Sequence, residues 1–171
     1  MVEWKRVPFH PADREAFVQG TLAPLWATQY PEIFDAADLG MAVSQPHYHF
    51  YEWLVAIAAL QEDGYLSLVE KYQFKKHVKD HAIFKDMAPK DLYHLVAKSR
   101  YFGSRQPPDL FVYREDRSEW FFCEVKGPED EISRAQEPYF AAIERMSPSP
   151  IRIARAFRDA ERTPLLIRGG A

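Results

Sequence analysis

The chain has very little cysteine and no long apolar run, and each absence excludes a class of protein. Its 171 residues include 1 cysteine, Cys123, which cannot form an intramolecular disulfide and has no second thiol for a zinc site. No apolar run approaches the roughly 18 residues that a membrane span needs, and the first residues lack the apolar stretch of a signal peptide. Internal repeats and low-complexity linkers are also absent. We therefore expect a soluble, cytoplasmic protein that contacts no membrane.

Excess positive charge is missing overall but is concentrated in one segment. The formal net charge is −3, yet residues 71–105 hold nine basic residues against three acidic ones (9 − 3 = +6), which leaves the rest of the chain at 13 − 22 = −9. A basic segment on an acidic protein is typical of a surface that binds a polyanion. A solvated helical face is the alternative explanation. The residues predicted to contact this polyanion are Lys71, Lys75, Lys76, Lys79, Lys85 and Arg105.

The hydrophobic pattern predicts an α/β fold. Residues 1–46, rich in proline and aromatic residues, are expected to form short helices packed onto the core. The basic segment is expected to be helical and divided at Pro89. The other expected elements are a helix from His47 to Gly64, a strand over 65–69, a hairpin of strands 110–113 and 120–126, a helix from Ser133 and a strand over 151–157.

One strand of the predicted hairpin carries residues suited to phosphodiester chemistry. Alternation over 120–126 places Glu124 and Lys126 on one face and Cys123, as a core residue, on the other. Asp109 opens the preceding strand, so the hairpin would bring its carboxylate toward Glu124. Two close carboxylates repel each other unless a hard cation such as Mg²⁺ or Mn²⁺ lies between them. The alternative is a solvent-facing ion pair on an edge strand.

These motifs resemble a known nuclease superfamily. PPD at 107–109 followed by EVK at 124–126 resembles the PD-(D/E)XK nucleases, and EVKGPEDEISRAQ over 124–136 is similar to the VRR-NUC branch. The resemblance covers roughly residues 47–158. It implies a restriction-endonuclease-like core in the order αβββαβ, with a mixed, mainly antiparallel sheet flanked by helices. Residues 1–46 would then be a helical elaboration and residues 159–171 a C-terminal tail.

The resemblance also implies roles for individual residues. Asp109 and Glu124 would be metal ligands with the Val125 carbonyl as a third, Lys126 the catalytic lysine and Gln136 an active-site helper. Glu52 lies on the helix where family members carry a further glutamate. Pro138 falls inside a helix that Ser133 and Gln136 would start as a capping box, so the direction of Gln136 depends on where that helix begins.

The implied reaction is magnesium-dependent hydrolysis of phosphodiester bonds in DNA, leaving a 5′-phosphate and a 3′-hydroxyl. Branched or flap-like DNA in replication or repair is the implied substrate. Two other functions stay open: an inert nucleic-acid-binding or assembly module, and a sequence-specific restriction enzyme. A homodimer is also left open. His77 and His81 are expected to be solvated or to face phosphate rather than to bind a transition metal, and His47 and His49 to be surface or packing residues.

Overall fold

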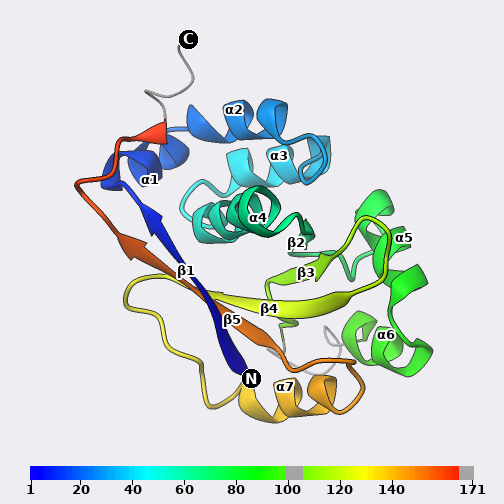
Figure 1. The fold of residues 1–171 in the computed structure, drawn as a ribbon. Helices are drawn as coiled ribbons and strands as arrows, with labels where there is room; N and C mark the ends of the chain where they lie inside the picture. Colours follow the sequence, from blue (N-terminus) through cyan, green and yellow to red (C-terminus); the bar gives the residue numbers. More distant parts are fainter. Residues whose placement is uncertain (99–105, 166–171) are drawn as a thin grey trace.

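A computed structural model describes residues 1–98 and 106–165 and has an α/β fold, in which one mixed sheet lies between two layers of helices (Figure 1). In chain order the elements are β1 (Val2–Phe9), α1 (Pro11–Val18), α2 (Leu22–Gln29), α3 (Ala36–Ser44), α4 (Phe50–Asp63), β2 (Leu66–Val69), α5 (Val78–Met87), α6 (Lys90–Ala97), β3 (Leu110–Tyr113), β4 (Trp120–Lys126), α7 (Glu137–Glu144) and β5 (Arg152–Arg158). None of the described helices is long and apolar enough to cross a membrane.

The sheet has five strands in the order β1-β5-β4-β3-β2. β3 pairs antiparallel with both β2 and β4, whereas β5 pairs parallel with both β4 and β1. The expectation of a mainly antiparallel sheet is therefore wrong, because β1 adds a second parallel pair. A parallel pair needs a crossover connection, and α7 lies within the crossover between β4 and β5.

The first strand corrects the expectation that residues 1–46 form helices alone. Val7 and Phe9 are buried on either side of Pro8, an alternation typical of a strand. β1 lies at the edge of the sheet, where a proline is tolerated. Residues 11–44 do form the expected short helices, α1 to α3.

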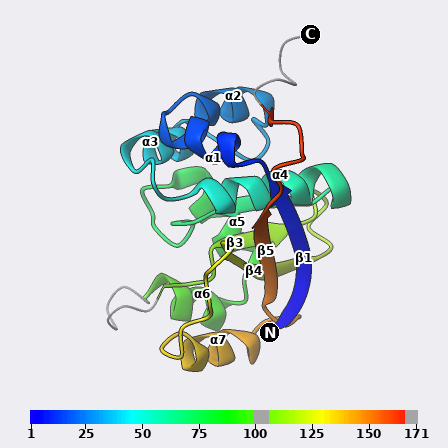
Figure 2. The same ribbon diagram turned by 90° about the vertical axis from the view of Figure 1, so that its left-hand side faces the viewer.

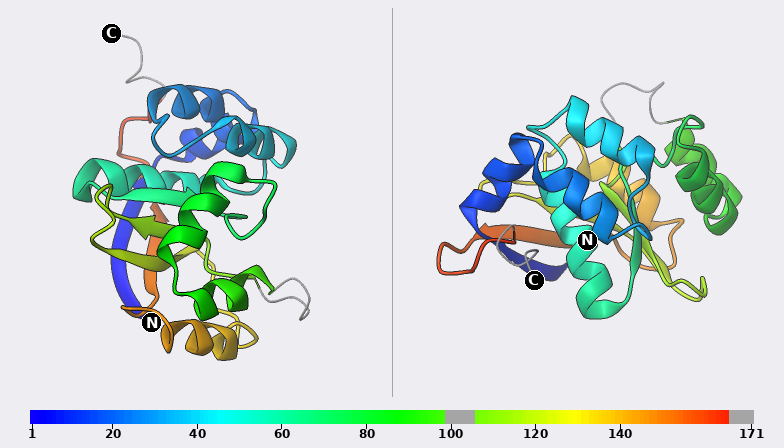
Figure 3. Two further views of the ribbon diagram at one scale, coloured as in Figure 1. Left: turned by 90° about the vertical axis from the view of Figure 1, so that its right-hand side faces the viewer. Right: turned by 90° about the horizontal axis from the view of Figure 1, so that it is seen from above.

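Two hydrophobic cores fill the spaces on either side of the sheet. Val112, Phe121 and Cys123 face the core under α1 to α4, whereas Phe111 and Phe122 face the core under α5 to α7. This alternation confirms that Cys123 is a buried core residue. α1 to α3 stack on the side of α4 that faces away from the sheet (Figures 2 and 3). α4 is therefore buried on most of its surface.

Most of the element boundaries confirm the predictions. α4 ends at Gly64, whose φ of 69° is the left-handed conformation that favours glycine at this position. β3 and β4 have the predicted bounds and pair antiparallel as a hairpin. Pro89 separates α5 from α6, as predicted. Two expectations are wrong: residues 72–77 of the basic segment form turns and bends rather than a helix, and α7 begins at Glu137 rather than near Ser133. Pro138 then lies in the first turn, where its missing N–H costs no helical hydrogen bond.

Candidate functional site

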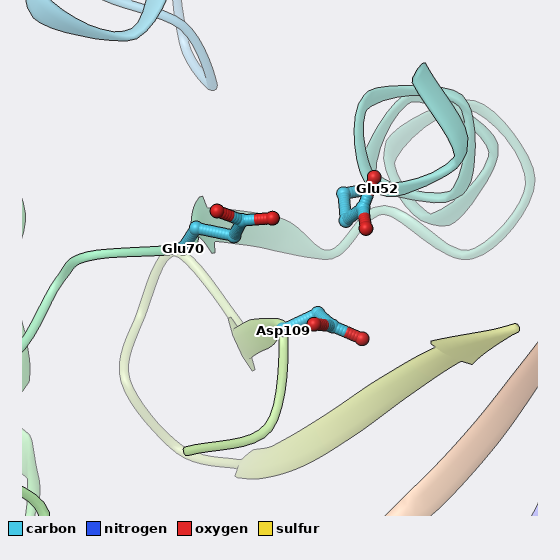
Figure 4. Close-up of side chains that lie close together, drawn as sticks. All are labelled: Glu52, Glu70 and Asp109. Carbon is cyan, nitrogen blue, oxygen red and sulfur yellow. The ribbon is translucent and has the colours of Figure 1, made fainter. Parts of the chain in front are cut away.

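Acidic side chains gather at one end of the sheet. β2 and β3 pair with Val69 opposite Leu110, so Glu70 and Asp109 just beyond them are neighbours, and the Glu70 N–H donates to the Asp109 carbonyl at 2.8 Å. Glu52 reaches the same place from the first turn of α4 (Figure 4). One carboxylate oxygen from each of the three residues lies within 4.8 Å of the others. This spacing allows one metal ion to contact all three carboxylates.

The backbone beside these carboxylates is strained. Of the described residues other than glycine, four have positive φ, and three of them border the acidic group: His49 (73°), Glu70 (45°) and Lys71 (50°). Left-handed conformations cost such residues free energy and persist where the surrounding structure holds them. Here a close contact links two of the three, because His49 Nδ1 lies 2.9 Å from Glu70 Oε1. The strained backbone and the contact with His49 therefore both act on the residue that carries the Glu70 carboxylate.

β4 supplies the neighbouring part of the site. The Val125 N–H donates to Asp109 Oδ2 at 2.8 Å. Among the side chains next to it, Lys126 Nζ donates to Glu124 Oε1 at 2.8 Å, and Gln136 Nε2 donates to the same oxygen at 3.2 Å. Glu124 Oε2 is buried and has no hydrogen-bond partner within the described part of the chain. Glu124 therefore keeps one oxygen free for a ligand.

The position of Gln136 follows from the local turn that precedes α7. The Gln136 Oε1 accepts the Ser133 N–H at 3.1 Å, which is one half of the predicted capping box. The amide nitrogen of Gln136 is left to donate to Glu124. The later start of α7 therefore still directs this side chain toward the site.

The charges of the cluster raise the pKa of its carboxyl groups. Burial, then the charge of Glu70, raises the pKa of Glu52 to about 7. Burial, then the charges of Glu124 and Glu52, raises the pKa of Asp109 well above its usual value. Burial also raises the pKa of Glu124, although the hydrogen bond and charge of Lys126 oppose the rise. Without a bound cation these groups favour protonation, and a divalent cation would relieve the same repulsion.

Gly127 lets the chain pass close to α4 at the end of β4. A Cβ at this position would lie 2.7 Å from Tyr51 Cε2 and 2.8 Å from Asp130 Oδ2. Asp130 Oδ2 in turn accepts the Gly127 N–H at 3.0 Å. The absent side chain thus allows β4 to end directly beneath the helix that carries Glu52.

The acidic group opens into a cavity of about 1020 Å³. Its lining includes Glu52, Glu70 and Asp109 together with three cationic side chains, Arg14, Lys71 and Arg158. A second cavity of about 500 Å³ shares Gln73 and Phe74 with the first, and it is lined by Lys75 and Lys76. The two cavities are therefore adjacent.

The basic segment is divided with respect to these cavities. Lys71 lines the acidic cavity, Lys75 and Lys76 line the second one, and Lys79 and Lys85 are exposed without lining either. Arg105 lies outside the described residues. Contact of all these residues with DNA stays a prediction.

The histidines of the basic segment differ from the expectation. His77 is buried before the start of α5, so the solvated interpretation is wrong for it, and burial lowers its pKa. His81 is half-buried, and its Nε2 lies 3.2 Å from the Tyr93 hydroxyl. Within the described residues neither histidine belongs to a group that could hold a metal ion.

The structure brings together most of the predicted site residues and adds two that the prediction missed. Glu52 and Asp109 meet, and Glu124, Lys126 and Gln136 form one hydrogen-bonded group beside them. The Val125 carbonyl as a ligand stays a prediction. The missed residues are Glu70 and His49. Glu70 directly follows the predicted strand over 65–69, and antiparallel pairing of that strand with β3 would have placed it beside Asp109.

Comparison with known proteins identifies no relative: no family model matches the chain, and no curated protein matches it at a significant level.

Proposed function

We propose that this protein is a divalent-cation-dependent nuclease that hydrolyses phosphodiester bonds in DNA. The observation that carries the proposal is the convergence of Glu52, Glu70 and Asp109 within 4.8 Å at the end of the sheet. Beside them, β4 presents the Glu124 carboxylate and the Lys126 ammonium in contact at 2.8 Å. Carboxylates for a cation and an ammonium for a phosphate are the parts that phosphodiester hydrolysis requires.

The donor atoms of the site suit a hard cation. The three side chains that meet offer carboxylate oxygens, which Mg²⁺ and Mn²⁺ prefer, whereas Zn²⁺ favours sulfur and nitrogen ligands. The free, buried Glu124 Oε2 offers a further oxygen next to Asp109. A bound cation would lower the pKa of a coordinated water and neutralise charge that develops on the phosphate.

The side chains would have separate roles. Glu52, Glu70 and Asp109 would hold the cation, and His49 would keep Glu70 in place through their 2.9 Å contact. Glu124 would orient Lys126, and Gln136 would hold Glu124 in place, because Lys126 Nζ and Gln136 Nε2 both donate to Glu124 Oε1. The Lys126 ammonium would stabilise the negative charge of the attacked phosphate.

The order of elements also supports the proposal. α4, β2, β3, β4, α7 and β5 follow the order αβββαβ that the PD-(D/E)XK likeness implies. α5 and α6 are inserted between the first and second of these strands, and β1 is added beside β5. The DNA substrate and the preference for branched or flap-like DNA belong to the same proposal.

The test combines metal titration with cleavage assays on labelled single-stranded, duplex, flap and four-way DNA. We expect Mg²⁺ or Mn²⁺ to support cleavage and a chelator to abolish it. Glu52→Gln should lose Mn²⁺ affinity in calorimetry and lose cleavage with it. Glu62→Gln, an exposed change on the same helix, should behave as wild type in both.

Two results would count against this function. Cleavage that persists in excess chelator would exclude the cation-dependent mechanism. A wild-type protein that binds Mn²⁺ and DNA but cleaves none of the substrates would favour the inert binding module instead.

A further inference from the structure

Three cations of the acidic cavity come from parts of the chain that lie far apart. Arg14 belongs to α1, Lys71 follows β2, and Arg158 ends β5. Arg14 and Arg158 are exposed, and among the described residues none of the three cations forms an ion pair with a carboxylate. Cations that are left unpaired around a cavity are available to an anionic ligand.

The strand order places these cations on opposite sides of the carboxylates. β2, β4 and β5 all finish at the end of the sheet where β3 begins. Across this end of the sheet the order is Arg158 at the end of β5, then the end of β4, then Asp109 before β3, and finally Lys71 beyond β2. Three strand spacings of roughly 4.8 Å separate β5 from β2, about 14 Å in all. This spread suits a chain of phosphates better than a single phosphate group.

Arg14 lies on the same side as Arg158. Its guanidinium carbon lies 5.7 Å from the centre of the Tyr51 ring. Burial, with the charges of Asp130 and Glu52, raises the pKa of the Tyr51 hydroxyl, and the charges of Arg14 and Arg158 oppose the rise. Tyr51 therefore lies between the arginine side of the cavity and its acidic floor.

When every carboxylate of the lining is ionised, the cavity carries an excess of negative charge that opposes anion binding. Three cationic side chains face five carboxylates in the lining, which gives 3 − 5 = −2 before any ion binds. One divalent cation brings this sum to zero. A polyanion would therefore be repelled while these carboxylates are ionised, and either a bound cation or protonation of Glu52 and Asp109 would remove that repulsion. The carboxylates in this count are Glu52, Glu70, Asp109, Glu129 and Asp130.

We propose that Arg14 and Arg158 on one side and Lys71 on the other bind the phosphates of a polynucleotide strand that crosses the carboxylates between them. This inference rests on the proposed nuclease function and names the part of the chain that holds its substrate. It assigns α1, which precedes the residues 47–158 that resemble the nucleases, to substrate binding.

The experiment measures binding without turnover. Fluorescence anisotropy of labelled oligo(dT) is followed in Ca²⁺, over a range of salt concentrations, for wild type and for the double variant Arg14→Ala/Arg158→Ala. We expect the double variant to bind on the order of tenfold more weakly and its log–log salt slope to fall by about 0.7 for each lost contact. Arg145→Ala, which changes an exposed arginine directly after α7 and outside the cavity, should bind as wild type.

Further measurements separate the two proposals. Calorimetric titration with Mn²⁺ should give the same affinity for wild type and double variant, because neither arginine would be a metal ligand, and thermal melts should show that both are folded. Thymidine monophosphate should compete poorly with oligo(dT). Wild-type DNA affinity and salt slope in the double variant would overturn the phosphate contacts alone, as would equally strong competition by the mononucleotide. A wild-type protein that binds no Mn²⁺ would overturn the nuclease and this inference together.

Discussion

Two buried aspartates, one in the N-terminal helices and one in the basic segment, make the stability of the protein depend on pH. Asp38 of α3 and Asp80 of α5 are 1% and 2% exposed, and each has a buried Oδ1 with no hydrogen-bond partner in the described part of the chain. Burial, then the charge of Asp80, raises the pKa of Asp38 to about 8. Burial, then the charge of Asp35, raises the pKa of Asp80 to about 7. We predict that Asp80→Asn stabilises the protein at neutral and alkaline pH.

The size of the effect follows from the pKa of Asp80. Its ordinary value is 3.8, so a folded-state value of about 7 means that the folded protein holds this proton over a pH range where the unfolded chain has lost it. The contribution of Asp80 to stability is therefore fully present below about pH 4 and is lost as the pH rises through about 7. At about 1.4 kcal/mol for each tenfold change, the full cost approaches about 4 kcal/mol. Asparagine resembles the protonated acid, so the variant avoids this cost.

The assay is urea unfolding of wild type and Asp80→Asn at several pH values. The difference in free energy of unfolding should be near zero at about pH 4 and should grow to a few kcal/mol at about pH 8, with about 4 kcal/mol as its upper limit. Asp91→Asn, an exposed aspartate of α6, is the control and should show no such growth. Asp38→Asn is less suitable, because Asp38 Oδ2 accepts the Asp35 N–H in a capping box. A difference between wild type and Asp80→Asn that stays constant with pH would refute the reasoning.

Three further predictions concern the site. Gly127→Ala should destabilise the protein by about 1–3 kcal/mol in urea, because the new Cβ meets Tyr51; Gly40→Ala, in a helix with open space around it, should not, and equal effects would contradict the close approach. Lys126→Ala should still bind Mn²⁺ and DNA while single-turnover cleavage falls about 10²–10³-fold, whereas Glu70→Gln should lose Mn²⁺ affinity; cleavage at the wild-type rate would remove Lys126 from the chemistry. Changing Lys75, Lys76 and Lys79 together to alanine should lower the salt slope for duplex DNA by about 0.9 per lost contact, and an unchanged slope in the folded variant would show that these lysines do not contact DNA.

The sequence determines the parts of the site that depend on neighbours along the chain. Alternation within β4 is enough to place Glu124 and Lys126 on one face, because successive side chains of a strand point to opposite faces. The short turn between β3 and β4 is enough to bring Asp109 to the same end as Glu124, because it allows only antiparallel pairing. The helical period and Gly64 are enough to predict α4 and its end, although the helix begins at Phe50 rather than at His47.

Only the tertiary structure decides the parts that depend on contacts across long stretches of chain. β1 and β5 pair from opposite ends of the described residues, and no local pattern specifies that register. Glu70 lies with the other carboxylates because β2 pairs with β3, although the basic segment separates the two strands in the sequence. Arg14 lines the cavity because β1 finishes at the same end of the sheet and α1 follows it. Periodicity tells which face of an element is buried, but the order in which strands meet is set by burying all those faces at once.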